Sequence, residues 1–134
     1  MISIVIPVFN EEENIDALHE RIVAESGGFE DAFEVLFVND GSTDQTEARI
    51  REIAEKDERF KLISFSRNFG QTAAIQAGID MASGEIIIPM DGDLQNDPGD
   101  IRKMIEKPEQ AYQVPSGWRK DRADSPIRRN LPSR

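Results

Sequence analysis

Short apolar runs alternate with segments of helical spacing along most of this chain. Each run is nearly continuous and rich in β-branched or aromatic residues, which is typical of a strand covered on both faces. Polar, turn-forming residues follow each run. The pattern predicts four strands, at Ile2–Val8, Phe33–Val38, Phe60–Phe65 and Glu85–Pro89.

The segments between the runs carry apolar residues at the spacing of an amphipathic helix. After the first run, Ile15, Leu18 and Ile22 share one helix face, and Ser26-Gly27-Gly28 ends that helix.

Two further helices follow the second and third runs. Asp44 and Glu47 predict a capping-box-like start for one of them. Its buried face consists of Ile50, Ile53 and Ala54. The other is alanine-rich, ends near Ser83-Gly84, and contains Gly78. A glycine inside a helix costs about 1 kcal/mol relative to alanine, so Gly78 predicts close packing on the sheet.

Strand and helix alternate four times, which predicts an α/β fold with a Rossmann-like, mostly parallel sheet and helices on both faces. Pro98 begins the fourth helix, with Ile101 and Ile105 turned inward, and Ala111–Pro115 is a short, weaker strand.

Two carboxylates, Asp91 and Asp93, stand on either side of Gly92 where the fourth predicted strand ends. Hard cations such as Mg²⁺ take oxygen ligands, often one or two carboxylates with substrate phosphates. The Asp-Gly-Asp sequence therefore indicates a metal–diphosphate site, although Asp and Gly also populate ordinary turns.

The turns after the other strands favour the metal site over the ordinary turn. In a parallel sheet all these turns lie at one edge, and acidic groups that meet there repel unless a cation joins them. The polar residues of the four turns are Asn10, Glu11, Asn39, Asp40, Asp44, Arg67, Asn68, Asp91, Asp93 and Gln95.

The composition excludes several other classes. A chain of 134 residues with 38% hydrophobic and 31% charged residues fits one globular domain. No apolar run approaches the roughly 18 residues of a membrane span, and the start lacks the pattern of a signal peptide. The absence of cysteine rules out disulfides and fits a reducing, cytoplasmic compartment. The only histidine, His19, is expected to face solvent, and no Ser-His-Asp set can be assembled.

The formal charge of −10 is unevenly distributed. Residues 118–134 carry six basic and two acidic side chains, whereas the preceding part is strongly acidic. An acidic body argues against nucleic-acid binding. The basic tail suits phosphates or an anionic membrane surface, or it is simply a solvated terminus.

Four motifs occur in the order in which one known family carries them. The chain resembles the inverting family-two nucleotide-sugar glycosyltransferases, which have the GT-A fold. The ending Asp-Leu-Gln-Asn-Asp-Pro and the segment Ser116-Gly117-Trp118-Arg119 are similar to the polyprenyl-phosphate branch, which acts on undecaprenyl or dolichyl phosphate. The motifs are Pro7-Val8-Phe9-Asn10-Glu11-Glu12, Val38-Asn39-Asp40-Gly41-Ser42-Thr43-Asp44, Arg67-Asn68-Phe69-Gly70 and Asp91-Gly92-Asp93-Leu94-Gln95.

The resemblance implies a role for each of these positions. Residues 1–117 would form the nucleotide-sugar-binding domain, and 118–134 the start of an acceptor-phosphate, membrane-proximal region. The donor would meet Pro7, Phe9, Glu11, Val38, Asp40, Asp91 and Gly92. Mg²⁺ or Mn²⁺ would bind Asp91, Asp93 and Gln95, and the acceptor phosphate would bind Arg119, Arg129 and Ser133. Asp93 and Arg119 would carry the catalytic roles.

Some of these residues also have plain structural interpretations. Pro7 and Val38 fit strand termination and core, Asp40 fits a turn or helix cap, and Gln95 fits a surface amide. Arg67 and Asn68 fit an ion pair with the acidic edge as well as a substrate contact.

The implied reaction is direct displacement at the anomeric carbon by the acceptor phosphate, with inversion and without a general base. It would take place at the cytoplasmic face of a membrane. Relatives continue beyond this length, so we expect a complete donor half and an incomplete acceptor half. A binding fragment without turnover is the alternative.

Two other α/β classes fit less well. A phosphoacceptor receiver domain requires Asp after the third strand and Lys after the fifth, where Arg67-Asn68 and Ser116-Gly117 stand here. A sugar nucleotidyltransferase requires a glycine-rich opening after the first strand, which is missing.

Overall fold

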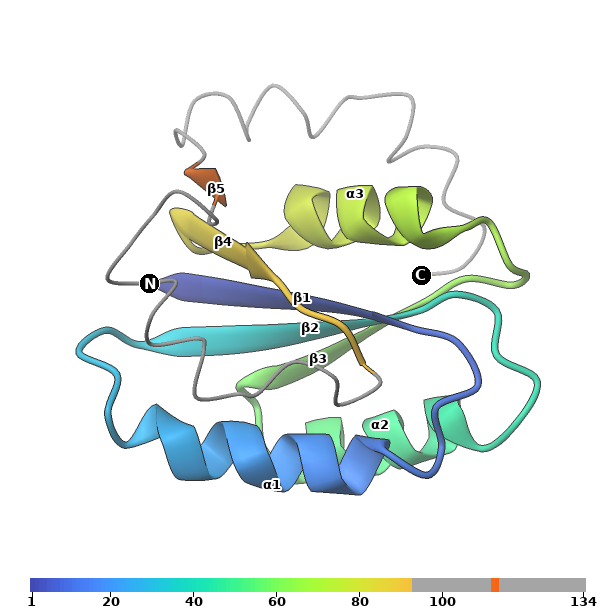
Figure 1. Cartoon of the computed structure of the whole chain (residues 1–134), viewed down its shortest axis with the longest axis horizontal. Helices are drawn as coiled ribbons and strands as arrows, with labels where there is room; N and C mark the ends of the chain where they lie inside the picture. The colour runs from blue at the N-terminus through green and yellow to red at the C-terminus, as the bar shows by residue number, and fades with distance from the viewer. Residues whose placement is uncertain (93–111, 114–134) are drawn as a thin grey trace.

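The computed structural model describes residues 1–92 and 112–113, and in this part of the chain a five-stranded sheet in the order β3-β2-β1-β4-β5 forms the central layer (Figure 1). Strands β1 to β4 are parallel, and β5 pairs antiparallel with β4. The strands are β1 (Ile2–Val8), β2 (Phe33–Asn39), β3 (Phe60–Ser64), β4 (Ile86–Pro89) and β5 (Tyr112–Gln113). The predicted mostly parallel α/β sheet is therefore confirmed.

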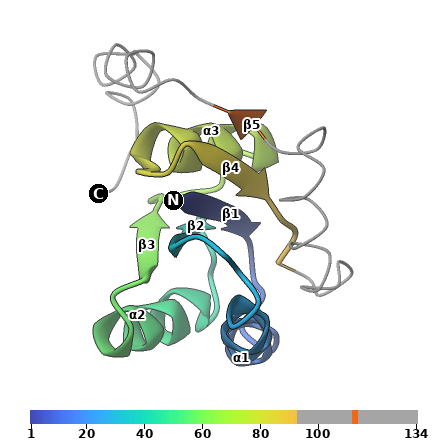
Figure 2. The same ribbon diagram turned by 90° about the vertical axis from the view of Figure 1, so that its left-hand side faces the viewer.

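Helices cover both faces of this sheet, as predicted. Helices α1 (Ile15–Ser26) and α2 (Thr46–Lys56) lie side by side on one face, and α3 (Gln71–Met81) lies on the other (Figure 2). No helix in residues 1–92 is long and apolar enough to cross a membrane.

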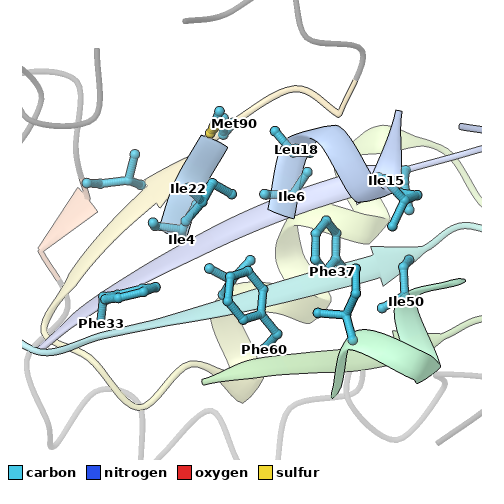
Figure 3. Close-up of a cluster of buried hydrophobic side chains, with 14 of the residues drawn as sticks. Ile4, Ile6, Ile15, Leu18, Ile22, Phe33, Phe37, Ile50, Phe60 and Met90 are labelled. Atoms are coloured by element: carbon cyan, nitrogen blue, oxygen red, sulfur yellow. The ribbon is translucent and has the colours of Figure 1, made fainter. Parts of the chain in front are cut away.

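Alternate residues of the strands serve the two faces, which is the expected consequence of the two-residue repeat of a strand. Ile4 and Ile6 of β1 pack with Phe37 and with the buried face of α1 (Figure 3). Val5 between them packs beneath α3. The near-continuous apolar runs of the sequence are thus explained by burial on both sides.

Gly78 lies where α3 crosses β1. A Cβ atom at this position would be 2.3 Å from Cγ1 of Val5, so only glycine lets the helix approach the strand this closely. The close packing predicted from the sequence is confirmed.

The prediction for His19 is wrong. Its imidazole is half-buried and contacts the ring of Phe60 edge-on, with 4.6 Å between the centroids. Its Nε2 atom lies 3.9 Å from the carboxylate of Asp57. A polar stretch of α1 gave no sign that this position lies over an aromatic residue of β3.

The predicted capping box at the start of α2 is also wrong. Gln45 is the N-cap and makes no side-chain cap hydrogen bond. The carboxylate of Asp44 accepts a hydrogen bond from the Thr46 N–H at 2.9 Å, and that of Glu47 accepts one from the Ser64 hydroxyl. Glu47 therefore serves the neighbouring strand rather than its own helix.

Several predictions fall outside the described residues. These are the helix after Pro98 with Ile101 and Ile105, the outer residues of the strand Ala111–Pro115, and the domain boundary between 117 and 118.

Candidate functional site

A cavity of about 300 Å³ opens at the carboxyl ends of the parallel strands. The chain runs from β1 outward to β2 and β3, and then places β4 on the opposite side of β1. Ligands of open α/β sheets bind where the strand order reverses in this way. The cavity is lined by Pro7, Val8, Phe9, Glu11, Asp40, Gln71, Asp91 and Gly92.

Six of the predicted donor-site residues therefore come together, and one does not. Val38 is fully buried among the residues beneath α3 and does not line the cavity. Val38 is thus a core residue, which was the alternative interpretation of this position from the sequence.

Close packing brings the turn after β4 against the end of β1. The Met90 N–H donates to the Val5 carbonyl at 2.9 Å, which extends the strand pairing up to Asp91. A Cβ atom on Gly92 would lie 2.6 Å from Cγ1 of Val8 and 3.3 Å from the Pro7 carbonyl. Any other residue at position 92 would push this turn away from β1 and move the Asp91 carboxylate with it.

Reciprocal hydrogen bonds join the turns after β1 and β2. The Asn10 N–H donates to the Ser42 hydroxyl at 2.9 Å, and the Thr43 N–H donates to Oδ1 of Asn10 at 2.8 Å. The Glu11 N–H donates to the Thr46 hydroxyl at 2.9 Å. Asn10 has a φ of 52°, a conformation that asparagine tolerates better than most residues. These contacts fix the backbone that carries Phe9 and Glu11.

Asp44 supports the same pair of turns. Burial alone would raise the pKa of its carboxyl, but hydrogen bonds from Thr46 and from the Glu12 N–H lower that pKa below its ordinary value. Asp44 thus stays ionised and acts as an acceptor for backbone groups, and it is not one of the residues that line the cavity.

Asp40 has a double position, since it lines the cavity and also fixes the turn after β3. Its carboxylate is buried and accepts hydrogen bonds from the Phe69 N–H at 2.7 Å, the Gly70 N–H at 3.0 Å and Nδ2 of Asn68 at 3.1 Å. The turn role considered for Asp40 and a place in the cavity lining therefore occur in one residue, and its contact with the donor stays a prediction. Asn68 serves this contact from the turn after β3, and a substrate contact of its side chain stays a prediction.

Arg67 makes no ion pair with the acidic edge among the described residues, and its contact with a substrate stays a prediction. Its guanidinium carbon lies 4.6 Å from the ring centroid of Phe69. Phe69 itself is 40% exposed and packs edge-on against Phe65.

Gln71 is a cavity residue that the sequence analysis missed. It is the first residue of α3 and is exposed, and it follows directly on the turn that Asp40 holds. The sequence signal was Gly70, which has a φ of 103° and marks the point where the helix begins.

The described residues bring one of the predicted metal-binding carboxylates, that of Asp91, to the cavity. The Asp91 carboxylate lines the cavity and, within residues 1–92, accepts no hydrogen bond. The same part of the chain contains no group of three His, Cys, Asp or Glu side chains that could hold a metal by itself. One carboxylate fits Mg²⁺ or Mn²⁺ when substrate phosphates and waters complete the coordination. Asp93, Gln95, Arg119, Arg129 and Ser133 lie outside the described residues.

Comparison with known proteins shows the family to which the chain belongs. Residues 3–134 match the family model "Glycosyl transferase family 2". The chain is 43% identical to dodecaprenyl-phosphate galacturonate synthase of Rhizobium johnstonii over 98% of its length. It is 40% identical to undecaprenyl-phosphate 4-deoxy-4-formamido-L-arabinose transferase of Aeromonas hydrophila over 96% of its length. It spans about 40% of the length of each of these relatives.

Solved structures share the fold. A mannosyltransferase from Pyrobaculum calidifontis in complex with GDP-Man and Mn²⁺ superposes with a TM-score of 0.61 at 26% identity, over 69% of this chain and 27% of that one. Glucosyl-3-phosphoglycerate synthase of Mycobacterium tuberculosis with Mn²⁺, UDP and phosphoglyceric acid gives a TM-score of 0.62 at 26% identity, over 79% and 38%. The chain therefore belongs to glycosyltransferase family 2, with the GT-A fold, and is related to the polyprenyl-phosphate sugar transferases.

Proposed function

We propose that this chain forms the donor-binding part of an inverting, metal-dependent glycosyltransferase. It would move a sugar from a UDP- or GDP-sugar to a polyprenyl phosphate at the cytoplasmic face of a membrane. The observation that carries the proposal is the cavity between the ends of β1 and β4, where the Asp91 carboxylate and Phe9 line the same space.

Within this cavity the residues divide into two chemical groups. Asp91 supplies negative charge at the switch point, and it would hold Mg²⁺ or Mn²⁺ together with Asp93 and Gln95. Phe9 is 45% exposed and offers an apolar ring at the cavity wall, which suits the planar base of a nucleotide. A nucleoside diphosphate carries both of the complementary features, a planar base and an anionic diphosphate.

Complexes of related enzymes support a nucleotide-sugar donor and a divalent cation. The mannosyltransferase from Pyrobaculum calidifontis binds GDP-Man and Mn²⁺, and TarS of Staphylococcus aureus, 25% identical with a TM-score of 0.64, binds UDP-GlcNAc. The chain covers 30% of the TarS chain and 27% of the mannosyltransferase chain. The polyprenyl acceptor is inferred from the sequence relatives, which are dodecaprenyl- and undecaprenyl-phosphate enzymes.

The reaction would be a direct displacement. An oxygen of the acceptor phosphate forms the new bond to the anomeric carbon while the bond to the nucleoside diphosphate breaks, so the configuration inverts. A bound cation would stabilise the charge that develops on the leaving diphosphate. The acceptor phosphate is already ionised near neutral pH, so the residues of this chain need only bind and orient. Asp91 and Asp93 would orient the donor, and Arg119, Arg129 and Ser133 the acceptor.

A nucleotide-sugar-binding unit without turnover is the second candidate. The chain spans about 40% of the length of the curated relatives, and the cavity among its described residues needs only donor-binding groups for this function. Donor binding without product from undecaprenyl phosphate would support it.

Calorimetric titration with UDP- and GDP-sugars, with and without Mn²⁺ or Mg²⁺, tests the proposal. We expect binding that depends on the cation and is lost in Asp91→Asn. Asp31→Asn makes the same chemical change at an exposed position outside the cavity and should bind as the wild type does. The absence of nucleotide binding under all conditions would show that the donor-site assignment is wrong.

A further inference from the structure

The strand that leads to Asp91 carries little information about its own register. β4 consists of Ile86, Ile87, Ile88 and Pro89. Ile87 packs on the α3 face of the sheet, and Ile86 and Ile88 pack on the opposite face. A slip of one residue along β1 would therefore still place isoleucine on both faces. The hydrophobic pattern that normally fixes the register of a strand therefore hardly distinguishes one register of β4 from the next.

The register nevertheless decides where the candidate site forms. A slip of one residue moves a strand by roughly 3.3 Å and turns each side chain to the other face. Asp91 would then leave the space beside Pro7 and Phe9. Since metal–ligand distances tolerate only about 0.2 Å, the site requires one register of β4.

A polar cluster built around the buried side chains of Ser3 and Glu34, at the end of the sheet opposite the cavity, holds the start of β4. We call Ser3, Glu34, Lys61, Ser83 and Gly84 the Glu34 cluster. The Glu34 side chain is 3% exposed. Its Oε2 atom accepts hydrogen bonds from the Ser3 hydroxyl and the Ser83 N–H, both at 2.6 Å, and its Oε1 atom accepts one from Lys61 at 2.6 Å. The Gly84 N–H donates to Ser3 Oγ at 2.8 Å.

The fit at Gly84 makes this attachment specific to one register. A Cβ atom there would lie 2.5 Å from the Met1 carbonyl and 2.6 Å from Ser3 Oγ. Gly84 is thus the residue of this segment that can pass so close to β1, and the Glu85 N–H donates to the Met1 carbonyl directly after it. Neither Ser83 nor Glu85 could take its place without a clash.

We propose that Glu34 and Ser3 are positioning residues for Asp91. They act from the amino-terminal end of the parallel strands by fixing the register of β4. The proposal rests on the proposed function, in which Asp91 binds the metal–diphosphate part of the donor. Neither residue lines the cavity. Their effect on the donor must therefore pass along the strand, from Gly84 through the isoleucines to Asp91.

The test uses the full chain with Glu34→Ala, Ser3→Ala and Glu34→Gln. The first two remove acceptors of the Ser83 or Gly84 N–H. Glu34→Gln is the conservative variant, because it keeps an oxygen that can accept from the Ser83 N–H and the Ser3 hydroxyl. The half-exposed Lys61 ammonium loses its partner in this variant and is solvated by water instead. Ile50→Val and Ile50→Ala truncate a fully buried side chain of α2 and provide a range of matched losses of stability.

Two readouts are needed, and the first does not require a ligand. Hydrogen exchange at the Met90 amide, which donates to the Val5 carbonyl, reports the register next to Asp91. The Phe65 amide, which directly follows β3 and donates to the Asn39 carbonyl of β2, is the internal reference. The second readout is the Kd for UDP and for GDP in the presence of Mn²⁺.

We expect Glu34→Ala and Ser3→Ala to accelerate exchange at Met90 relative to Phe65 and to raise the nucleotide Kd by roughly 2- to 30-fold, the usual range for remote coupling. Glu34→Gln and the Ile50 variants should leave the exchange rate of Met90 relative to Phe65 unchanged, and they should leave the nucleotide Kd unchanged. Unchanged Met90 exchange, or faster exchange with an unchanged Kd, would overturn the positioning role. If the wild type binds neither nucleotide, the proposed function fails, and Met90 exchange still decides whether the cluster places Asp91.

Discussion

Asp40, at the end of β2, accepts a hydrogen bond of 2.7 Å from the backbone N–H of Phe69 in the turn after β3. The same carboxylate accepts bonds from Gly70 and Asn68, and its own N–H donates to the Val8 carbonyl at 2.9 Å. One residue therefore joins the ends of three neighbouring strands. The cavity wall and the start of α3 behave as one unit because both depend on Asp40.

This arrangement makes Asp40→Asn informative. The carboxamide keeps one acceptor oxygen but places an N–H₂ group against either the Phe69 N–H or the Gly70 N–H. We expect the free energy of unfolding to fall by about 1–3 kcal/mol, the cost of a buried donor left unsatisfied. Mn²⁺-dependent nucleotide binding should weaken as well, because the turn that carries Gln71 loosens. Urea unfolding and calorimetry measure the two effects.

Asp31→Asn is the control, since Asp31 is exposed and lies away from the cavity. Asp40 would be shown to lack the proposed anchoring role if both variants unfolded at the same urea concentration.

Gly92 offers a test of the close approach between β4 and β1. In Gly92→Ala the new Cβ would lie 2.6 Å from Cγ1 of Val8, which is buried at 2% exposure. Such overpacking costs about 1–3 kcal/mol of stability and should displace the Asp91 carboxylate, so that nucleotide binding weakens.

Val8→Ala removes the clashing methyl group and provides the matched second change. The double variant Gly92→Ala/Val8→Ala should lose less unfolding free energy than the two single variants lose together. Its loss of nucleotide affinity should likewise be smaller than the sum of the two single-variant losses. Strict additivity would contradict the packing argument.

Gln71 should affect binding without affecting folding. It is exposed at the first position of α3, so Gln71→Ala should change the free energy of unfolding by no more than about 0.5 kcal/mol. If its amide contacts the donor, the nucleotide Kd should rise roughly 2- to 10-fold, the value of one neutral hydrogen bond. Gln45→Ala is the control, because Gln45 is also exposed at the start of a helix but does not line the cavity. Equal Kd values for the two variants would remove Gln71 from the site.

The fold and part of the site were predictable from sequence because both depend on local patterns. Apolar runs define strands, and polar residues at their ends must meet at one edge once the strands are parallel. This logic predicted the position of Asp91 at the edge where the cavity lies, and the family resemblance added Gly92. It could not identify Asn68 as the partner of Asp40, because that contact joins residues far apart in sequence and depends on the loop geometry. It also failed for His19, whose environment is set by an aromatic side chain of β3 rather than by its own helix.

Glu34 gives the molecule a specific pH dependence. Burial alone would raise the pKa of this carboxyl, but hydrogen bonds from Lys61, Ser3 and Ser83 hold it below the ordinary value of 4.5. A carboxyl with a lowered folded-state pKa stabilises the protein fully above its unfolded-state pKa. That stabilisation is lost as the pH falls through the lower, folded-state pKa.

Comparison of the wild type with Glu34→Gln isolates this contribution, because glutamine cannot ionise. At pH 7 the wild type should be more stable by about 1–3 kcal/mol, the value of a hydrogen bond to a charged group. The difference should stay constant down to about pH 5 and shrink below the ordinary value of 4.5. Urea unfolding between pH 7 and pH 3 measures it, with Asp31→Asn as the exposed reference. A difference that grew on acidification would mean that Glu34 is protonated in the folded protein, and that the bonds from Lys61, Ser3 and Ser83 do not hold its charge.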